Sequence, residues 1–183
     1  MTTDSHLVIA GMQGNACAGG MMLALGADHI YARRGVVLQP HYRALGRFHG
    51  SEMWTYSLPR RVGAEQAAEL VKQCRDLSAL EAQRIGLIDE CLSVRADKFR
   101  EEVIVRALDL IRGSSFEKLL TEKRERRQRD EAQRPLSAHR MDELAKCWGP
   151  IFNSNSDYHE ARRRLVHRHA AQSSISHAGA RQV

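Results

Sequence analysis

Gly14, Gly19 and Gly20 are the residues whose spacing first indicates chemistry. Gly14 follows the apolar run 7–10, and Gly19 and Gly20 open a run of small residues typical of a tightly packed helix. Glycine has no Cβ, so another molecule can approach the backbone closely there. The free N–H groups of a first helical turn can stabilise a carbonyl oxygen that gains negative charge. The alternative is purely structural, because small residues also suit a helix packed against a sheet, and the glycines alone favour that interpretation.

Short apolar runs and turn residues predict the elements that must position these glycines. Buried strands are expected at 7–10, 29–32 and 35–38, with the small-residue helix at 19–27 and a loop at 39–50. A short helix capped by Ser51 is expected to stop at Pro59. Ser78 and Glu81 form a capping box for a helix that Gly86 ends.

The segment 7–92 resembles the acyl-CoA-binding half of the crotonase (enoyl-CoA hydratase/isomerase) superfamily. The resemblance is carried by G-x-A-x-x-G-G at 14–20, by LPRRVGAEQAAEL and by LSALEAQRIGLIDECL, in the expected order and spacing. It implies an α/β fold, with a partial crotonase-like (ββα spiral) core of short strands followed by a helical C-terminal region. It also implies coenzyme A, bound as a thioester, as the ligand.

A narrower resemblance is to the C-terminal domain of the HypX/HoxX family of hydrogenase maturation factors. The stretches QPHY, GSEMWTYSLPRRVG, EKRERRQRDEAQRPLSAHRMDEL and SDYHEARRRLVHR carry it. In that family a formyl-tetrahydrofolate-handling domain precedes the crotonase-like domain, and formyl-CoA leads to the carbon monoxide ligand of nickel–iron hydrogenase. The resemblance therefore implies formyl-CoA as substrate, an N-terminal formyl-transfer domain or chain as partner, and contact with the hydrogenase maturation machinery.

The superfamily alignment assigns roles to Gly19 and Tyr42. Gly19 falls on the glycine whose N–H is the second donor of the oxyanion hole. Because the first donor comes from strands that precede this turn, we expect the chain to be the C-terminal portion of a longer protein. Met22 and Tyr42 occupy the two positions where hydratases carry glutamates, so hydration of an enoyl-CoA is not expected.

Tyr42 and Glu52 are the expected catalytic pair, together with Gly19. In this hypothesis Glu52 orients or deprotonates the Tyr42 phenol, the formyl proton is removed, the C–S bond breaks, and carbon monoxide and coenzyme A leave. In the alternative, Glu52 only begins a helix and Tyr42 packs on Trp54. Further candidates for substrate binding are Asn15, Ala16, Gly20, His41 and Tyr56.

Charge and composition narrow the classes of partner. The net charge is +6, but the basic residues concentrate in 118–134 and 162–168, and the first of these stretches mixes in acidic residues at helical spacing. A solvated helix face, or attraction of the phosphates of coenzyme A, is expected rather than nucleic-acid binding. The four cysteines form no C-x-x-C pair and the histidines lack paired carboxylates, so no metal is expected. Without a signal peptide or a spanning apolar run, a cytoplasmic protein is expected, with no membrane contact.

Three regions follow from these patterns. Residues 1–112 are expected to form the C-terminal half of a crotonase-like acyl-CoA-binding core, 113–171 a charged helical extension, and 172–183 a disordered tail. Helices are expected at 63–74, 97–112, 116–133, 137–148 and 157–170, with a turn at Gly149 and Pro150. The helix at 97–112 has one apolar side, made by Phe99, Val103, Leu108 and Ile111. Two further functions stay open: a generic hydratase/isomerase-type enzyme for another acyl-CoA, and a non-catalytic fragment that needs an N-terminal partner.

Overall fold

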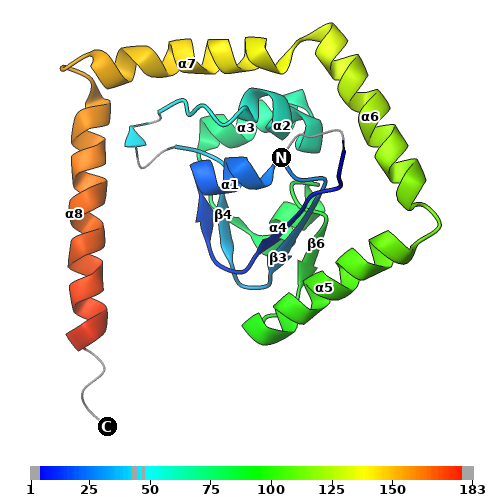
Figure 1. Cartoon of the computed structure of the whole chain (residues 1–183). Coiled ribbons are helices and arrows are strands. Elements are labelled where there is room, and N and C mark those ends of the chain that lie inside the picture. Colours follow the sequence, from blue (N-terminus) through cyan, green and yellow to red (C-terminus); the bar gives the residue numbers. More distant parts are fainter. Residues whose placement is uncertain (1–4, 43–44, 47, 179–183) are drawn as a thin grey trace.

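Two small sheets form the centre of the molecule. A computed structural model describes residues 5–42, 45–46 and 48–178, with side chains described up to His167. In the first sheet, β1 (Ile9–Met12), β3 (His29–Arg33) and β6 (Glu90–Leu92) run parallel in the order β1-β3-β6. In the second, β4 (Val37–Gln39) pairs parallel with β2 (Ala16–Cys17) and antiparallel with β5 (Leu77–Ser78). The expected α/β fold with short strands is confirmed (Figure 1).

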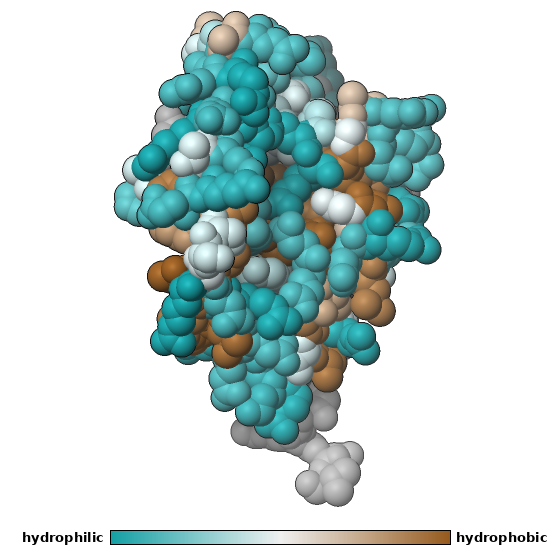
Figure 2. Space-filling model, turned by 90° about the vertical axis from the view of Figure 1, so that its right-hand side faces the viewer, coloured by the Kyte–Doolittle hydropathy of each residue, from teal (hydrophilic) through white to brown (hydrophobic). Residues whose placement is uncertain are grey.

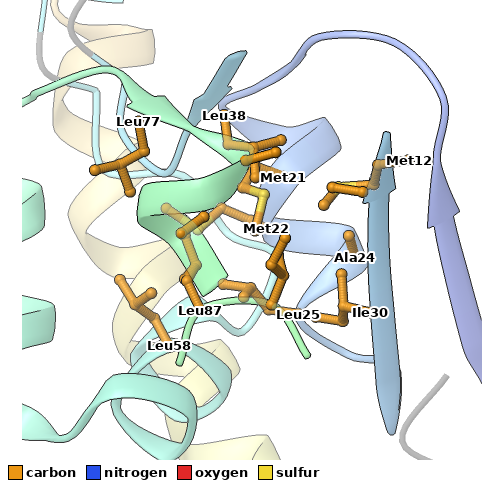
Figure 3. Close-up of a cluster of buried hydrophobic side chains, with 14 of the residues drawn as sticks. Met12, Met21, Met22, Ala24, Leu25, Ile30, Leu38, Leu58, Leu77 and Leu87 are labelled. Atoms are coloured by element: carbon orange, nitrogen blue, oxygen red, sulfur yellow. The ribbon is translucent and has the colours of Figure 1, made fainter. Parts of the chain in front are cut away.

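Helix α1 (Gly19–Ala24) lies at the core and contributes its most buried side chains. Figure 3 shows Met21, Met22 and Leu25 facing apolar side chains from both sheets and from the surrounding helices, among them Ile30, Leu38, Leu58, Leu77 and Leu87. Each large apolar side chain buried in this way contributes roughly 1.5–3 kcal/mol. The burial fixes the position of Gly19, the first residue of α1.

Helices α2 (Trp54–Val62), α3 (Ala64–Gln73) and α4 (Ala79–Arg84) complete this core. The Ser78 half of the capping box is confirmed, since the Glu81 N–H donates to Ser78 Oγ at 3.2 Å, whereas the Glu81 carboxylate pairs with Arg75. The prediction for α2 is wrong at both ends. Its N-cap residue is Met53 rather than Ser51, and Pro59 lies inside the helix, which continues to Val62, with the Gly63 N–H donating to the Pro59 carbonyl at 2.8 Å.

Helices α5 (Ala96–Arg112), α6 (Phe116–Gln133), α7 (Leu136–Phe152) and α8 (Asp157–Ala178) form an arch around the core (Figure 1). Three details differ from expectation. Of the four residues expected on the apolar side of α5, Phe99 and Val103 pack inward, whereas Leu108 and Ile111 are 38% and 61% exposed. Helix α7 runs through Gly149 and Pro150, and α8 continues to Ala178 instead of ending near 170. The rest of the expected tail, 179–183, lies outside the described residues.

The side of the molecule that carries α6 is largely hydrophilic, with hydrophobic patches between (Figure 2). Ion pairs at helical spacing, such as Lys118–Glu122 and Arg127–Glu131, occur on α6. Within the described part of the chain, every helix is too short or too polar to cross a lipid bilayer.

A buried lysine joins α6 to the core. Lys123 Nζ lies 2.7 Å from Asp28 Oδ2 and 2.6 Å from the His6 carbonyl, and the same Asp28 carboxylate accepts the Val8 N–H at 2.7 Å. The two charged side chains are only 3% and 12% exposed. Asp28 precedes β3, so this contact holds the turn between α1 and β3 against the arch.

We expect Lys123→Met to lower the free energy of unfolding by roughly 3–5 kcal/mol, because it removes the hydrogen-bonded cation of the buried Asp28 carboxylate and leaves Arg126, at 4.0 Å, as its ion-pair partner among the described residues. Lys118→Met is the matched control on the same helix, since Lys118 is 77% exposed and its ion pair with Glu122 is loose. The control is expected to change stability by about 0.5 kcal/mol or less. Urea denaturation of both variants checks this, and equal losses would contradict a structural role for Lys123.

Candidate functional site

The turn before α1 is strained at the residue that precedes Gly19. Ala18 has φ 48° and ψ −124°, a conformation that residues with a side chain rarely adopt, and its N–H donates to the Gln39 carbonyl at 2.9 Å. Such backbone strain costs roughly 1–3 kcal/mol and is typical of functional turns. Sequence patterns gave no indication of it, because alanine is not a residue associated with positive φ.

Gly19, Tyr42 and Glu52 meet at this turn. A Cβ built on Gly19 would lie 3.0 Å from Glu52 Oε1 and 3.5 Å from the Tyr42 hydroxyl. The ends of both side chains therefore lie directly over the backbone at Gly19, and only glycine leaves the space between them open. The structure brings together the three residues expected to be catalytic.

Tyr42 is 8% exposed and packs edge-on against Phe48, with ring centroids 5.9 Å apart. In the alternative, Tyr42 is expected to pack on Trp54. The ring of Trp54 packs on His49 instead. Burial raises the pKa of the Tyr42 phenol, and the nearby Glu52 carboxylate raises it further. The acceptor beside the hydroxyl is the Glu52 carboxylate, which lies outside ideal hydrogen-bond geometry. The phenol thus keeps its proton, which favours a donor role over deprotonation by Glu52.

Glu52 lies before α2, not in its first turn. Its Oε2 accepts the N–H of Ser51 at 2.9 Å, while Oε1 faces Gly19. Glu52 therefore lies one residue before the N-cap of α2, Met53, and is not part of the helix. An open hollow of about 300 Å³ reaches this carboxylate and is lined by Met22, Leu23, Gly26, Ser51, Glu52, Met53, Tyr56 and Ser57. A substrate in that hollow would contact Glu52 directly.

The five residues expected to bind substrate are less closely gathered. His41 is buried beside Tyr42 around a small cavity of about 60 Å³, with its Nε2 3.5 Å from Asp76 Oδ1. Asn15 Oδ1 accepts the Val37 N–H at 2.9 Å and so supports the strand pairing. Ala16 lies in β2, and the exposed Gly20 has no atom within 4 Å of a Cβ built on it.

Tyr56 faces α6. Its hydroxyl donates to Asp130 Oδ2 at 2.8 Å and accepts from Arg127 Nη1 at 2.9 Å, while the guanidinium carbons of Arg60 and Arg127 lie 5.3 and 5.2 Å from its ring centroid. The Tyr56 hydroxyl is therefore engaged by α6, although the residue also lines the hollow beside Glu52.

A second hollow, of about 400 Å³, lies between α2 and α6 and is rich in basic residues. Most of its cations already have anionic partners within the protein: Arg60 pairs with Asp130, Arg61 with Asp89, Lys123 with Asp28 and Arg127 with Glu131. Arg126 has the most distant partner of these cations, because its Nη2 is 4.0 Å from Asp28 Oδ1. This region is mainly an ion-pair network that attaches α6 to the core.

Sequence analysis missed a buried stripe on α7, formed by His139, Glu143 and Cys147. These residues are four apart and share one helix face, a pattern visible in the sequence. No role for these three residues is expected from the sequence. The described residues contain no group of three or more His, Cys, Asp or Glu side chains placed to hold a metal ion.

Comparisons with known proteins show which family and fold this chain resembles. The family model described as Enoyl-CoA hydratase/isomerase matches residues 1–145. The hydrogenase maturation factor HoxX of Bradyrhizobium diazoefficiens is 37% identical over 91% of this chain and 29% of its own length. The crystal structure of HypX from Aquifex aeolicus in complex with tetrahydrofolic acid is 38% identical, with a TM-score of 0.85 over 91% of this chain and 30% of that chain. This chain thus spans about three tenths of the length of either protein.

A more distant structure shares the fold. An enoyl-CoA hydratase/isomerase from Pseudoalteromonas atlantica is 18% identical, with a TM-score of 0.72 over 88% of this chain and 62% of that chain.

Gly50→Ala is expected to disrupt the site and the fold together. Gly50 has φ +78°, and a Cβ there would lie 2.4 Å from Cε2 of the buried Tyr42 ring and 2.8 Å from Glu52 Oε2. Gly35→Ala is the control, since Gly35 has φ +90° in open space. The control should lose roughly 1–2 kcal/mol for its backbone conformation. Gly50→Ala should lose a further 1–3 kcal/mol or so for overpacking, measured by chemical denaturation. Equal losses would show that Tyr42 and Glu52 move aside freely.

The raised pKa of Tyr42 predicts that the free energy of unfolding depends on pH. An unfolded tyrosine ionises near pH 10, whereas folded Tyr42 keeps its proton at that pH. Its contribution to stability is therefore present below about pH 10 and is lost as the pH rises above 10. Spectra of the native protein minus those of Tyr42→Phe should contain no phenolate absorbance from this residue below about pH 10. A phenolate step near neutral pH would contradict the donor role.

Proposed function

Because this chain belongs to the enoyl-CoA hydratase/isomerase family, we propose that it binds a coenzyme A thioester with the carbonyl group at Gly19. The likeness to HoxX covers 91% of the chain, including most of the arch of α5 to α8. We therefore propose formyl-CoA as the thioester and carbon monoxide as the product. HypX binds tetrahydrofolic acid, a one-carbon carrier, which is consistent with a one-carbon acyl group.

The convergence of Glu52 and Tyr42 over Gly19 is the observation that carries this proposal. The Gly19 N–H would donate to the formyl oxygen. Glu52 would take the proton from the formyl carbon, and the C–S bond electrons would leave with sulfur as carbon monoxide forms. The Tyr42 hydroxyl, which holds its proton, would donate it to the departing thiolate and regain it from Glu52. The balance is formyl-CoA to carbon monoxide and free coenzyme A.

Met22 supports this choice over hydration of an enoyl-CoA. It stands where the resemblance places one hydratase glutamate, and it is 1% exposed within the apolar core. A hydratase needs a base for water and an acid for the α carbon. Here one carboxyl group and one phenol are present, which suits removal of one proton and return of another.

We also propose which partners this chain acts with and where the reaction takes place. A chain that spans three tenths of HoxX and HypX would act with an N-terminal formyl-transfer domain or chain, in contact with the hydrogenase maturation machinery. We place the reaction in the cytoplasm. No role for a metal ion, a nucleic acid or a membrane is proposed.

A hydratase/isomerase-type activity on a longer acyl-CoA is the second candidate. The hollow beside Glu52, at about 300 Å³, has more room than a formyl group requires. In that case Glu52 would shuttle a proton between carbons of the acyl chain. If no thioester binds, we would infer a non-catalytic role in which the chain only completes a partner's fold.

We expect Glu52→Gln to lower kcat for carbon monoxide release from formyl-CoA by roughly 10²–10⁴-fold, because the proton acceptor is lost. Tyr42→Phe should also abolish most of the activity. Tyr31→Phe, a buried tyrosine on β3, is the control and should keep the rate within about twofold. Carbon monoxide is measured by its binding to haemoglobin, and calorimetry reports coenzyme A binding.

Full carbon monoxide output from Tyr42→Phe would contradict the mechanism. Turnover of crotonyl-CoA but not of formyl-CoA would favour the second candidate. Absence of coenzyme A binding to the folded chain would contradict both enzymatic proposals.

A further inference from the structure

Helix α7 contacts the segment that carries Glu52 on both sides of that residue. His139, Glu143 and Cys147 form the buried face of α7 at this contact. Cys147 Sγ donates to the Gly50 carbonyl at 3.1 Å, which lies before Glu52 in the chain. Glu143 and His139 contact Met53 and Thr55, which follow it.

Glu143 makes the most extensive of these contacts. Its Oε2 accepts the Met53 N–H at 2.7 Å, and its Oε1 accepts the Thr55 N–H at 2.8 Å and the Thr55 hydroxyl at 2.6 Å. The side chain is 0% exposed. The first N–H groups of a helix have no partner within it, and a negative charge is favoured at that end. Glu143 thus caps α2 from a helix about 90 residues later in the chain.

The capped segment is one that would not keep its shape alone. Met53 has φ 59° and ψ 31°, a left-handed conformation that non-glycine residues rarely adopt. Gly50, with φ +78°, bends the chain two residues before Glu52. Between these bends Glu52 points toward Gly19 and Tyr42. A change in the Met53 bend would therefore redirect the Glu52 carboxylate.

We propose that Glu143 is a positioning residue, and that its bonds to Met53 and Thr55 set the direction of the Glu52 carboxylate. The proposal rests on the proposed function only in treating Glu52 as catalytic. The holding of the segment 50–55 is independent of the reaction. The C-terminal arch, through α7, then sets the geometry of the active site in addition to surrounding the core.

Glu143→Gln in the full chain tests this proposal, because an amide in that place must turn its NH₂ toward backbone donors. Hydrogen exchange followed by mass spectrometry should show the amides of Met53 and Thr55 exchanging at least tenfold faster, with peptides from 20–32 unchanged. For carbon monoxide release, kcat should fall at least tenfold while KM stays within twofold. A residue that only stabilised the fold would not produce this split.

Asp142→Asn is the matched control, since it removes a neighbouring carboxylate that is exposed and pairs with Arg134 on the surface. It should leave both readouts unchanged. Unchanged exchange at Met53 and Thr55 in Glu143→Gln would overturn the proposal. If the unaltered chain releases no carbon monoxide, the proposed function fails, and the exchange measurement still decides whether Glu143 holds the segment.

Thr55→Val provides the second variant should Glu143→Gln fail to fold, which circular dichroism would show. It removes the hydroxyl that bonds both Glu143 and His139. Exchange at Met53 and Thr55 should then rise at least threefold. An unchanged exchange rate at Met53 and Thr55 in this variant would by itself overturn the proposal.

Discussion

Burial of one very short helix is the constraint on which the rest of the molecule depends. Helix α1 has six residues, fewer than an isolated helix needs to be stable in water. Met21 and Met22 are nevertheless fully enclosed by both sheets and by the helices that follow. Packing therefore creates this helix, and the same packing fixes Gly19 at its start. The tips of Tyr42 and Glu52 can meet over Gly19 only while that packing holds.

Local patterns predicted the elements whose ends are set locally. The C-terminal end of α6 at Gln133 follows from the break at Pro135, and the cap of α4 follows from Ser78 and Glu81. The start of α2 could not be predicted, because its cap is Glu143, a side chain distant in sequence. The continuation of α7 through Gly149 and Pro150 also overrides local preference.

The meeting of Tyr42 with Glu52 was predictable, since both belong to one short stretch and the family resemblance points to that stretch. The backbone around them was not. Ala18 and Met53 have positive φ, and each stands directly beside a residue expected to be catalytic. Neither residue type signals that conformation, because the surrounding packing imposes it. Strain of roughly 1–3 kcal/mol at each position is thus supplied by the tertiary structure.

The Tyr42 hydroxyl is buried, and the Glu52 carboxylate beside it does not complete a well-formed hydrogen bond. An unsatisfied buried donor costs about 1–3 kcal/mol in the folded protein. A bound molecule that offers an acceptor atom there recovers this free energy, whereas a molecule that presents a methyl group does not. The difference corresponds to roughly five- to 150-fold in affinity. The site beside Tyr42 therefore discriminates between ligands through a hydrogen bond that folding leaves incomplete.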